Sequence, residues 1–220
     1  MNALIRTAAA TVLLFSALAA NAKPTSTPTP QQRQAAQKLA GISVRMLDLS
    51  RLFRYNGSEH SWYRQFQANM TAEEFRCFTT KMGTPQGFRA YKMDEALDYV
   101  QHRSPQDLQR DFALLTPQTV QALSRLMSAW EDGITHNNND RYIREMDRLQ
   151  QNPRLFNAVG RFMESAQHHD LRQLLLSFAF DTAPIEDGAR SLERYVLWSL
   201  RECHISAEEL RARARGGAGK

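Results

Sequence analysis

The amino-acid sequence predicts an all-α protein, an irregular multi-helix bundle that holds one disulfide bridge. Apolar side chains recur three and four residues apart through most of the chain, which is the period of an amphipathic helix. Pairs of a hydroxyl residue and proline, a typical helix start, occur repeatedly. No segment alternates apolar and polar residues as a half-buried strand does. These observations together favour helices alone.

Residues 1–22 are predicted to be a signal peptide. Arg6 precedes an apolar run over residues 8–20, and Ala20-Asn21-Ala22 places small residues around a polar one, as signal peptidase requires. An uncleaved anchor is the alternative. The run is short for a bilayer span, and no later stretch approaches the roughly 20 apolar residues that such a span needs. The expected location is therefore the periplasm of a Gram-negative bacterium or the medium, with no integral membrane segment after cleavage.

The rest of the chain divides by composition. Residues 23–30 are rich in Pro and Thr and are expected to form an extended tether. Residues 31–210 form the predicted helical domain, and residues 211–220 a basic Gly/Arg tail that is expected to be disordered. The formal charge is +5, but residues 31–210 carry 22 Lys and Arg against 23 Asp and Glu. Because a nucleic-acid-binding protein carries its basic surface on the folded body, no nucleic-acid partner is expected.

The first half of the domain shows the helix signals in order. A long helix is predicted from Pro30 through Phe53, ending at Asn56-Gly57, and a short one around Trp62 and Phe66. Thr71 and Glu74 form a capping box for the next helix, which Gly83 is expected to end in a left-handed conformation. A capping hydroxyl stands before proline at the first helical position in Thr29-Pro30, Thr84-Pro85, Ser104-Pro105 and Thr116-Pro117.

The second half continues in the same style. Asp132-Gly133 is expected to end a helix, and residues 135–139 to form a loop. Further helix starts are expected at Asp140, Asn152-Pro153, Asp170 and Ser206, with a break around Pro184.

Cys77 and Cys203 are predicted to form a disulfide. The expected export sends the chain to an oxidising compartment, where such bridges persist. The alternative is two buried thiols that pack as small apolar residues.

One set of residues suggests a metal site. Asp94, Asp98 and His102 follow one another at four-residue intervals and so share a helix face, and Glu164 and His168 make a similar pair. Carboxylates and imidazoles could together bind a divalent ion if the two faces met. The alternative is a solvated charged face with Lys92 and Arg103 as local partners. No cofactor is otherwise expected.

No catalytic residues are assigned, because the sequence contains no nucleophile elbow, phosphate-binding loop or His-Glu-x-x-His motif. The polar stretch from His136 to Asp140 lacks the acidic spacing of a calcium-binding loop and is interpreted as a surface loop. The stripes of Phe, Trp and Met are expected to be core, although an exposed part around Trp62 and Tyr63 would make a partner surface.

The corner over residues 71–91 resembles an uncharacterised family of exported bacterial helical proteins, and a looser similarity extends over residues 62–91. Thr71, Glu74, Phe75 and Phe78 match the helix of that family, and Thr84, Pro85 and Gly87 match its Ser-Pro-x-Gly corner. Lys81 and Met82 replace the Phe-Tyr that is usual there. The resemblance implies an exported helical fold and assigns no activity.

The function expected from these observations is non-enzymatic: an exported helical protein that binds another protein or associates with the envelope. An immunity or inhibitor protein is a specific version of this class. The alternative is a periplasmic metal-dependent hydrolase that uses the five candidate metal ligands.

Overall fold

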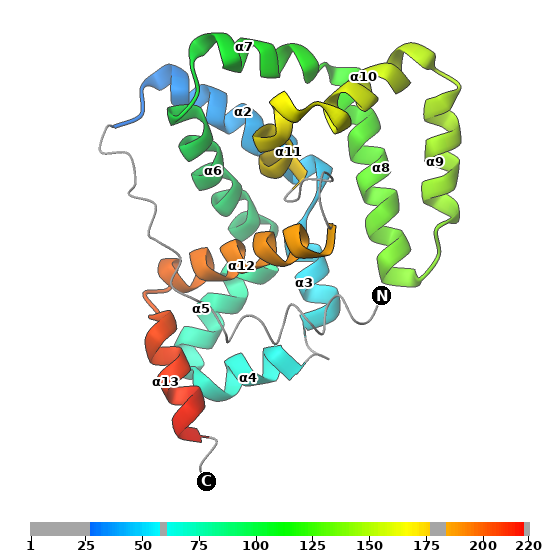
Figure 1. Ribbon diagram of the computed structural model, residues 1–220. Coiled ribbons are helices and arrows are strands. Elements are labelled where there is room, and N and C mark those ends of the chain that lie inside the picture. Colours follow the sequence, from blue (N-terminus) through cyan, green and yellow to red (C-terminus); the bar gives the residue numbers. More distant parts are fainter. Residues whose placement is uncertain (1–26, 58–60, 177–183, 218–220) are drawn as a thin grey trace. The chain divides into compact units, whose positions relative to one another are not determined.

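A computed structural model describes residues 27–57, 61–176 and 184–217 (Figure 1). Over these residues the chain forms α-helices and one short 3-10 helix with no β-strand, so the all-α prediction is confirmed. The predicted signal peptide and residues 23–26 of the predicted tether lie outside the described residues. In chain order the elements are α2 (Pro30–Met46), α3 (Leu49–Gly57), α4 (Ser61–Asn69), α5 (Ala72–Gly83), α6 (Pro85–Gln101), α7 (Pro105–Leu114), α8 (Pro117–His136), α9 (Asp140–Gln150), α10 (Pro153–Glu164), η1 (Ala166–His168), α11 (His169–Leu176), α12 (Pro184–Glu202) and α13 (Ala207–Gly217).

The described chain divides into two compact units. Unit 1 contains residues 49–91 and the chain from Ala189 onward, and unit 2 contains the described residues up to Asp48 together with residues 92–188. Unit 1 is therefore assembled from two segments that the whole of residues 92–188 separates in the sequence. Because each unit is built from segments of the same helical composition, no change in composition marks the boundary.

Helix starts marked by proline or by a capping box lie where the capping pattern predicts them, whereas Asp140 and Asp170 lie within the first turns of α9 and α11. α2, α7 and α8 each begin with a proline after Thr or Ser, whose hydroxyl accepts a hydrogen bond from the amide three positions on. α10 begins in the same way at Asn152-Pro153. In the capping box of α5 the Glu74 amide donates to the Thr71 hydroxyl at 3.2 Å, and the Thr71 amide donates to the Glu74 carboxylate at 2.7 Å. These bonds join close neighbours in the sequence, so the sequence pattern is sufficient to locate them.

α3 ends at Gly57 as predicted, but the end of α5 differs from the prediction. Gly83 does not adopt a left-handed conformation, and no described glycine has a positive φ. Long side chains of unit 1 supply the missing donors at the end of α5: the Arg54 guanidinium donates to the Gly83 carbonyl at 2.7 Å, and the Tyr195 hydroxyl donates to the Lys81 carbonyl at 2.7 Å. These donors belong to other helices, so local sequence cannot reveal them.

The predicted long helix from Pro30 through Phe53 is broken after Met46. Leu47 is extended, with φ −148° and ψ 127°, and the Asp48 amide donates at 3.0 Å to the carboxylate of buried Glu131 on α8. The bond satisfies a backbone donor that the break leaves outside the helix.

Two other predicted boundaries are wrong. Asp132-Gly133 does not end α8, which continues to His136; a Cβ on Gly133 would lie 3.2 Å from the Asn138 carbonyl oxygen, so glycine lets the loop fold back on the helix. Residues 211–217 of the predicted disordered tail are helical and belong to α13.

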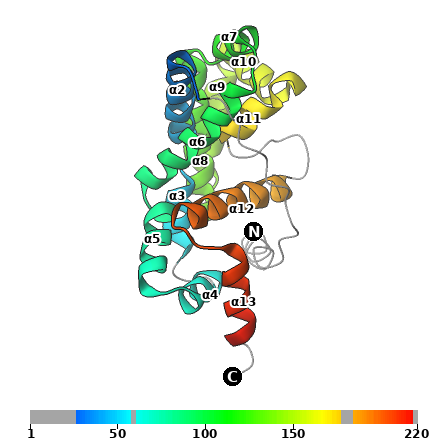
Figure 2. The same ribbon diagram turned by 90° about the vertical axis from the view of Figure 1, so that its left-hand side faces the viewer.

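The two segments of unit 1 meet in an aromatic core. The Tyr195 ring packs against Phe88 and Tyr91, with centroid separations of 5.5 and 4.7 Å, and the Trp198 ring lies 5.6 Å from Tyr91. The predicted disulfide joins Cys77 of α5 to Cys203 after α12, with the Cα atoms 5.9 Å apart, so that prediction is confirmed. Figure 2 shows α4 beside both α5 and α13, which it contacts.

The corner between α5 and α6 depends on Gly87. The Thr84 hydroxyl accepts from the Gly87 amide at 3.1 Å and donates to the Thr80 carbonyl at 2.6 Å. A Cβ on Gly87 would overlap the Lys81 carbonyl, whose carbon would be only 2.7 Å away. The glycine of the Thr-Pro-x-Gly pattern thus allows the backbone at the start of α6 to pack closely against the last turn of α5.

Unit 2 is organised around α8, which contacts α2, α9 and α10. Figure 1 shows α9 running alongside α8 in the opposite direction. α2 also packs on α11, where the Ser43 hydroxyl lies within hydrogen-bonding distance of the Leu174 and Leu175 carbonyls, at 2.9 and 3.1 Å. The core of unit 2 includes Leu39, Ile42, Met46, Leu123, Met127, Phe162, Leu171 and Leu175. Among the described helices of either unit, none has the length and apolar content needed to cross a bilayer.

Candidate functional site

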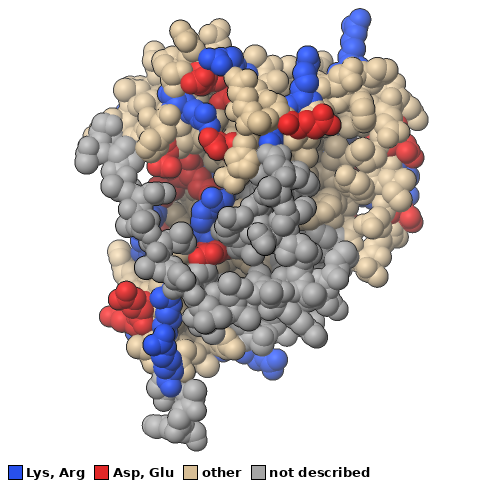
Figure 3. All heavy atoms as spheres, viewed as in Figure 1, with Lys and Arg blue, Asp and Glu red and all other residues tan. Residues whose placement is uncertain are grey.

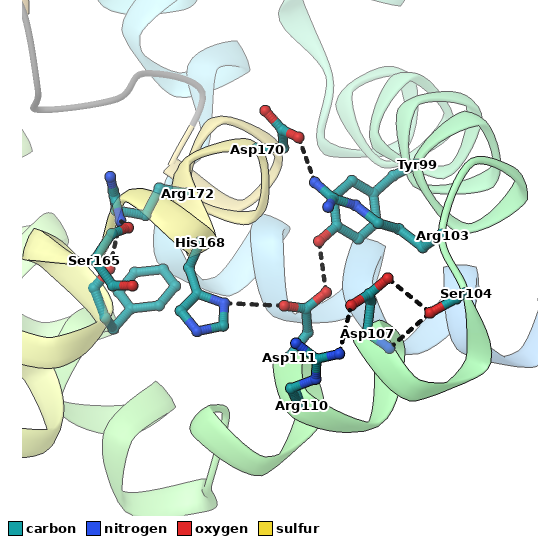
Figure 4. Close-up of polar contacts among 11 residues, drawn as sticks. Tyr99, Arg103, Ser104, Asp107, Arg110, Asp111, Ser165, His168, Asp170 and Arg172 are labelled. Atoms are coloured by element: carbon teal, nitrogen blue, oxygen red, sulfur yellow. Dashed lines mark hydrogen bonds and ion pairs between the residues drawn. The ribbon is translucent and has the colours of Figure 1, made fainter.

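A buried polar network in unit 2 joins α6, α7 and η1 (Figure 4). Its members are Tyr99, Asp111 and His168. The Tyr99 hydroxyl donates to one oxygen of the Asp111 carboxylate at 2.6 Å, and Nδ1 of His168 lies 3.0 Å from the other. Asp111 is 5% exposed and His168 is 8% exposed. Both carboxylate oxygens are thus occupied in a site from which water is largely excluded.

The position of Asp111 follows from the pattern of α7. Leu108 and Leu115 lie three residues before and four residues after it, so Asp111 falls on the apolar stripe that faces the core. An acidic residue within such a stripe must find partners, because burying an unpaired carboxylate is costly. That signal could have identified Asp111 from the sequence, whereas nothing local indicates that Tyr99 and His168 are the partners.

Burial and a hydrogen bond keep the Tyr99 phenol protonated. Burial, followed by the hydrogen bond to Asp111, raises the pKa of Tyr99 above its ordinary value, so the phenol remains a donor at neutral pH. The Arg103 guanidinium lies over the Tyr99 ring, 4.8 Å from its centroid, and pairs with Asp170 of α11.

The network could orient a general base but shows no second catalytic component. A carboxylate on Nδ1 holds an imidazole ready to accept a proton at Nε2. Nε2 of His168 has no hydrogen-bond partner within the described chain, and in Figure 4 it points away from the other labelled side chains. A nucleophile in reach of Nε2 is therefore missing from the described residues, and the evident role of the network is to fasten three elements together.

Two buried cations of unit 2 donate hydrogen bonds to carbonyl groups at helix ends. The Lys92 ammonium is fully buried and donates to the Leu174 carbonyl near the end of α11 at 2.8 Å and to Glu95 at 2.7 Å. The buried Arg172 guanidinium donates to the Phe162 carbonyl at 2.9 Å and to the Ser165 carbonyl at the end of α10. Positive charge at a helix C-terminus is favourable, so both cations are explained by structure rather than by chemistry on a substrate.

The predicted metal site does not form among the described residues. Asp98 and His102 are exposed on α6, and Nδ1 of His102 lies 2.8 Å from the Asp98 backbone carbonyl. Glu164 is exposed at the end of α10, and His168 faces Asp111 instead of the other candidates. No group of three or more His, Cys, Asp or Glu in the described chain is arranged to hold a metal ion, so Asp94, Asp98, His102, Glu164 and His168 are not brought together.

The alternative of a solvated charged face is also inaccurate for Lys92 and Arg103. Lys92 is buried, and Arg103 pairs with Asp170 from a different helix. Helical spacing correctly places residues on a face, but packing decides which faces are covered.

The predicted partner surface around Trp62 and Tyr63 takes a different form. The side chain of Trp62 lies outside the described residues. Tyr63 is only partly exposed, and its ring packs edge-on against Phe75 at 5.1 Å and lies 6.3 Å from Phe53. Tyr63 is thus part of the aromatic packing of unit 1.

Two exposed hydrophobic side chains lie instead on α9 and α10. Ile143 is 54% exposed and Phe156 is 40% exposed, and they are the large hydrophobic residues that the described chain leaves in solvent. α9 and α10 contact each other and are joined by only Gln151 and Asn152. We call Ile143, Phe156 and the exposed Arg144, Arg154 and Arg161 of the same two helices the hairpin surface. The guanidinium groups of these three arginines make no ion pair or hydrogen bond with described residues.

Fold and sites together define a disulfide-linked, all-helical protein of two compact units. Comparisons with protein-family models, with curated proteins and with solved structures find no match for this chain.

Proposed function

We propose that this chain is an exported helical protein that acts by binding another protein, without catalysis of its own. The observation that carries the proposal is the hairpin surface. A folded chain buries large apolar side chains, so two exposed ones on adjoining helices are the part of the described surface best suited to a partner.

The composition of the hairpin surface supports a protein partner. Aromatic residues and arginine are enriched at the energetically important positions of protein interfaces. Phe156 provides the aromatic group, and Arg144, Arg154 and Arg161 provide donors that the described chain does not use. The partner that fits is a folded protein presenting an apolar patch with carboxylates at its rim. A periplasmic immunity or inhibitor protein that masks an enzyme is a specific version of this proposal.

Two observations support export. The sequence begins with the features of a signal peptide, and the Cys77–Cys203 bridge suits an oxidising compartment. The proposed membership in the exported helical family is supported by the corner that Gly87 permits between α5 and α6.

The alternative of a metal-dependent hydrolase has less support. Its five proposed ligands are not assembled among the described residues. The Asp111–His168 pair is the remaining element that chemistry could use, and it lacks a reactive neighbour.

The experiment begins with the mature protein at native level, recovered from the periplasm, and the identification of any stoichiometric companion. The companion is then purified and titrated calorimetrically with wild type and with the double variant Ile143→Ser/Phe156→Ser. Loss of an interface anchor costs about 2 kcal/mol, or roughly thirtyfold in Kd, so the double variant should weaken binding by several hundredfold or more.

Two controls make the result specific. Asn157→Ser changes an exposed polar residue of α10 next to Phe156 and should leave Kd unchanged. His168→Asn disrupts the polar network and should also retain binding once folding is verified. The proposal is contradicted if the double variant binds the companion protein as tightly as wild type does. It is also contradicted if His168→Asn abolishes a catalytic activity of the protein while leaving partner binding intact.

A further inference from the structure

The charge of the protein is separated between the two units. Over residues 49–91 and 189–220, unit 1 contains 13 Lys and Arg against 7 Asp and Glu, a formal net charge of +6. Residues 22–48 and 92–188 of unit 2 contain 14 against 16, a net charge of −2. Within residues 31–210 alone, unit 1 holds 9 basic residues against 7 acidic ones and unit 2 holds 13 against 16, so residues 211–220 supply four of the six net positive charges of unit 1.

Several carboxylates of unit 1 pair with its basic side chains. The Arg213 guanidinium donates to Glu74 at 2.7 Å, and Glu202 lies near both Lys81 and Arg201, at 3.8 Å from each. Four exposed arginines, by contrast, have guanidinium groups with no ion pair or hydrogen bond to the described chain: Arg64, Arg76, Arg89 and Arg215. Figure 3 shows further basic side chains following α13, with acidic ones gathered near its start.

The chemistry of this surface points to phosphate on an extended anionic partner. Eleven of the 13 basic residues are arginines, whose planar guanidinium groups bind phosphate oxygens in pairs. Phe88, Tyr91 and Trp198 of unit 1 are buried, Tyr63 and Phe75 are partly exposed, and the large hydrophobic residues that the described chain leaves in solvent lie outside this unit. Stacking on unpaired bases and insertion of side chains into a bilayer both need exposed aromatic or apolar groups, which the described part of unit 1 does not present.

We propose that unit 1 associates with the surface of an anionic phospholipid membrane through arginine–phosphate contacts, without inserting into it. The choice of a membrane rather than a nucleic acid rests on the proposed export, because membranes are the extended phosphate surfaces of that compartment. Basic residues near an anionic leaflet each strengthen binding by about fivefold, and four to eight of them suffice for association. The attraction is screened within about 10 Å at ordinary salt, so binding falls as salt rises.

The test uses the mature full-length protein and sedimentation with lipid vesicles. One vesicle contains equal amounts of phosphatidylglycerol and phosphatidylcholine, and the other phosphatidylcholine alone. The triple variant Arg64→Gln/Arg76→Gln/Arg89→Gln removes three unpaired charges from unit 1. The matched control, Arg144→Gln/Arg154→Gln/Arg161→Gln, removes three unpaired charges from unit 2. Thermal unfolding verifies that both variants fold, since substitutions of exposed side chains change stability little.

The expected result is binding to the anionic vesicles alone, abolished by high salt. The unit 1 variant should bind about a hundredfold more weakly than wild type, while the unit 2 variant binds like wild type. Three results would overturn the proposal: no binding to anionic vesicles at low salt, equal losses in the two variants, or tighter binding to duplex DNA than to vesicles of equal phosphate content. Failure of the hairpin surface to bind a protein leaves these measurements unaffected, so the two proposals can fail separately.

Discussion

Removing the Cys77–Cys203 bridge should destabilise unit 1 strongly. The bridge joins the two segments of that unit across a sequence separation of 126 residues. Closing a loop of this length lowers the entropy of the unfolded chain by an amount worth about 5 kcal/mol, and measured disulfide contributions are typically about 2 to 4 kcal/mol. A whole domain is stable by about 5 to 15 kcal/mol, so the double variant Cys77→Ala/Cys203→Ala should lose a large part of its stability.

Urea unfolding of wild type and the double variant measures the total loss, and amide hydrogen exchange shows where it falls. We expect the variant to unfold at lower urea, with lost protection concentrated in α5 and the C-terminal half of α12. Reductant should move wild type to the midpoint of the variant and should leave the variant unchanged. An unchanged midpoint, or equal loss of protection throughout unit 2, would refute the reasoning that this bridge holds two distant segments together.

Two further predictions concern the α5–α6 corner and the start of α5. Gly87→Ala should lower stability by about 1 to 3 kcal/mol in thermal unfolding, because its Cβ overlaps the Lys81 carbonyl. The control is Gly160→Ala, whose Cβ would have nothing within 4 Å and which should be neutral or stabilising. Equal effects of Gly87→Ala and Gly160→Ala on stability would contradict the steric overlap at Gly87. The hydrogen bond from Arg213, with that from the Thr71 amide, lowers the pKa of Glu74 from 4.5 to about 2. The ionised Glu74 carboxylate therefore stabilises the folded protein above pH 4.5, and this contribution is lost as pH falls toward 2. Arg213→Gln should remove most of this pH dependence, which is small because the pair is exposed to solvent. An unchanged slope in acid unfolding would show that Glu74 is not the source of the pH dependence.

The helix starts and the covalent bridge could be predicted from the sequence. Thr29, Thr71, Ser104 and Thr116 each bond to an amide three residues away, and such contacts depend only on local geometry. Helix ends were less predictable. Arg54 and Tyr195 reach the last carbonyls of α5 from other helices, and the break after Met46 is completed by Glu131 on α8.

The candidate sites show the same division. The spacing of Asp94, Asp98 and His102 correctly places them along one helix, yet their side chains do not meet Glu164 and His168. His168 instead contacts Asp111, a residue that the metal hypothesis did not include. Which faces of two helices meet depends on packing across the whole unit, and helical spacing carries no information about it.

By itself, the sequence determined an all-helical chain, the helix starts that are marked by a capping residue before proline or by a capping box, and the pairing of its two cysteines. Apolar periodicity and helix caps depend on residues that are close in the sequence, and a chain with two cysteines allows only one internal pairing. These features can therefore be recognised without knowledge of the fold. Only the tertiary structure decided that residues 49–91 and 189–217 form one unit, that Tyr99, Asp111 and His168 share a buried network, and that Ile143 and Phe156 stay exposed. These outcomes depend on apolar burial and buried hydrogen bonds between distant segments, which exist only after the chain has folded.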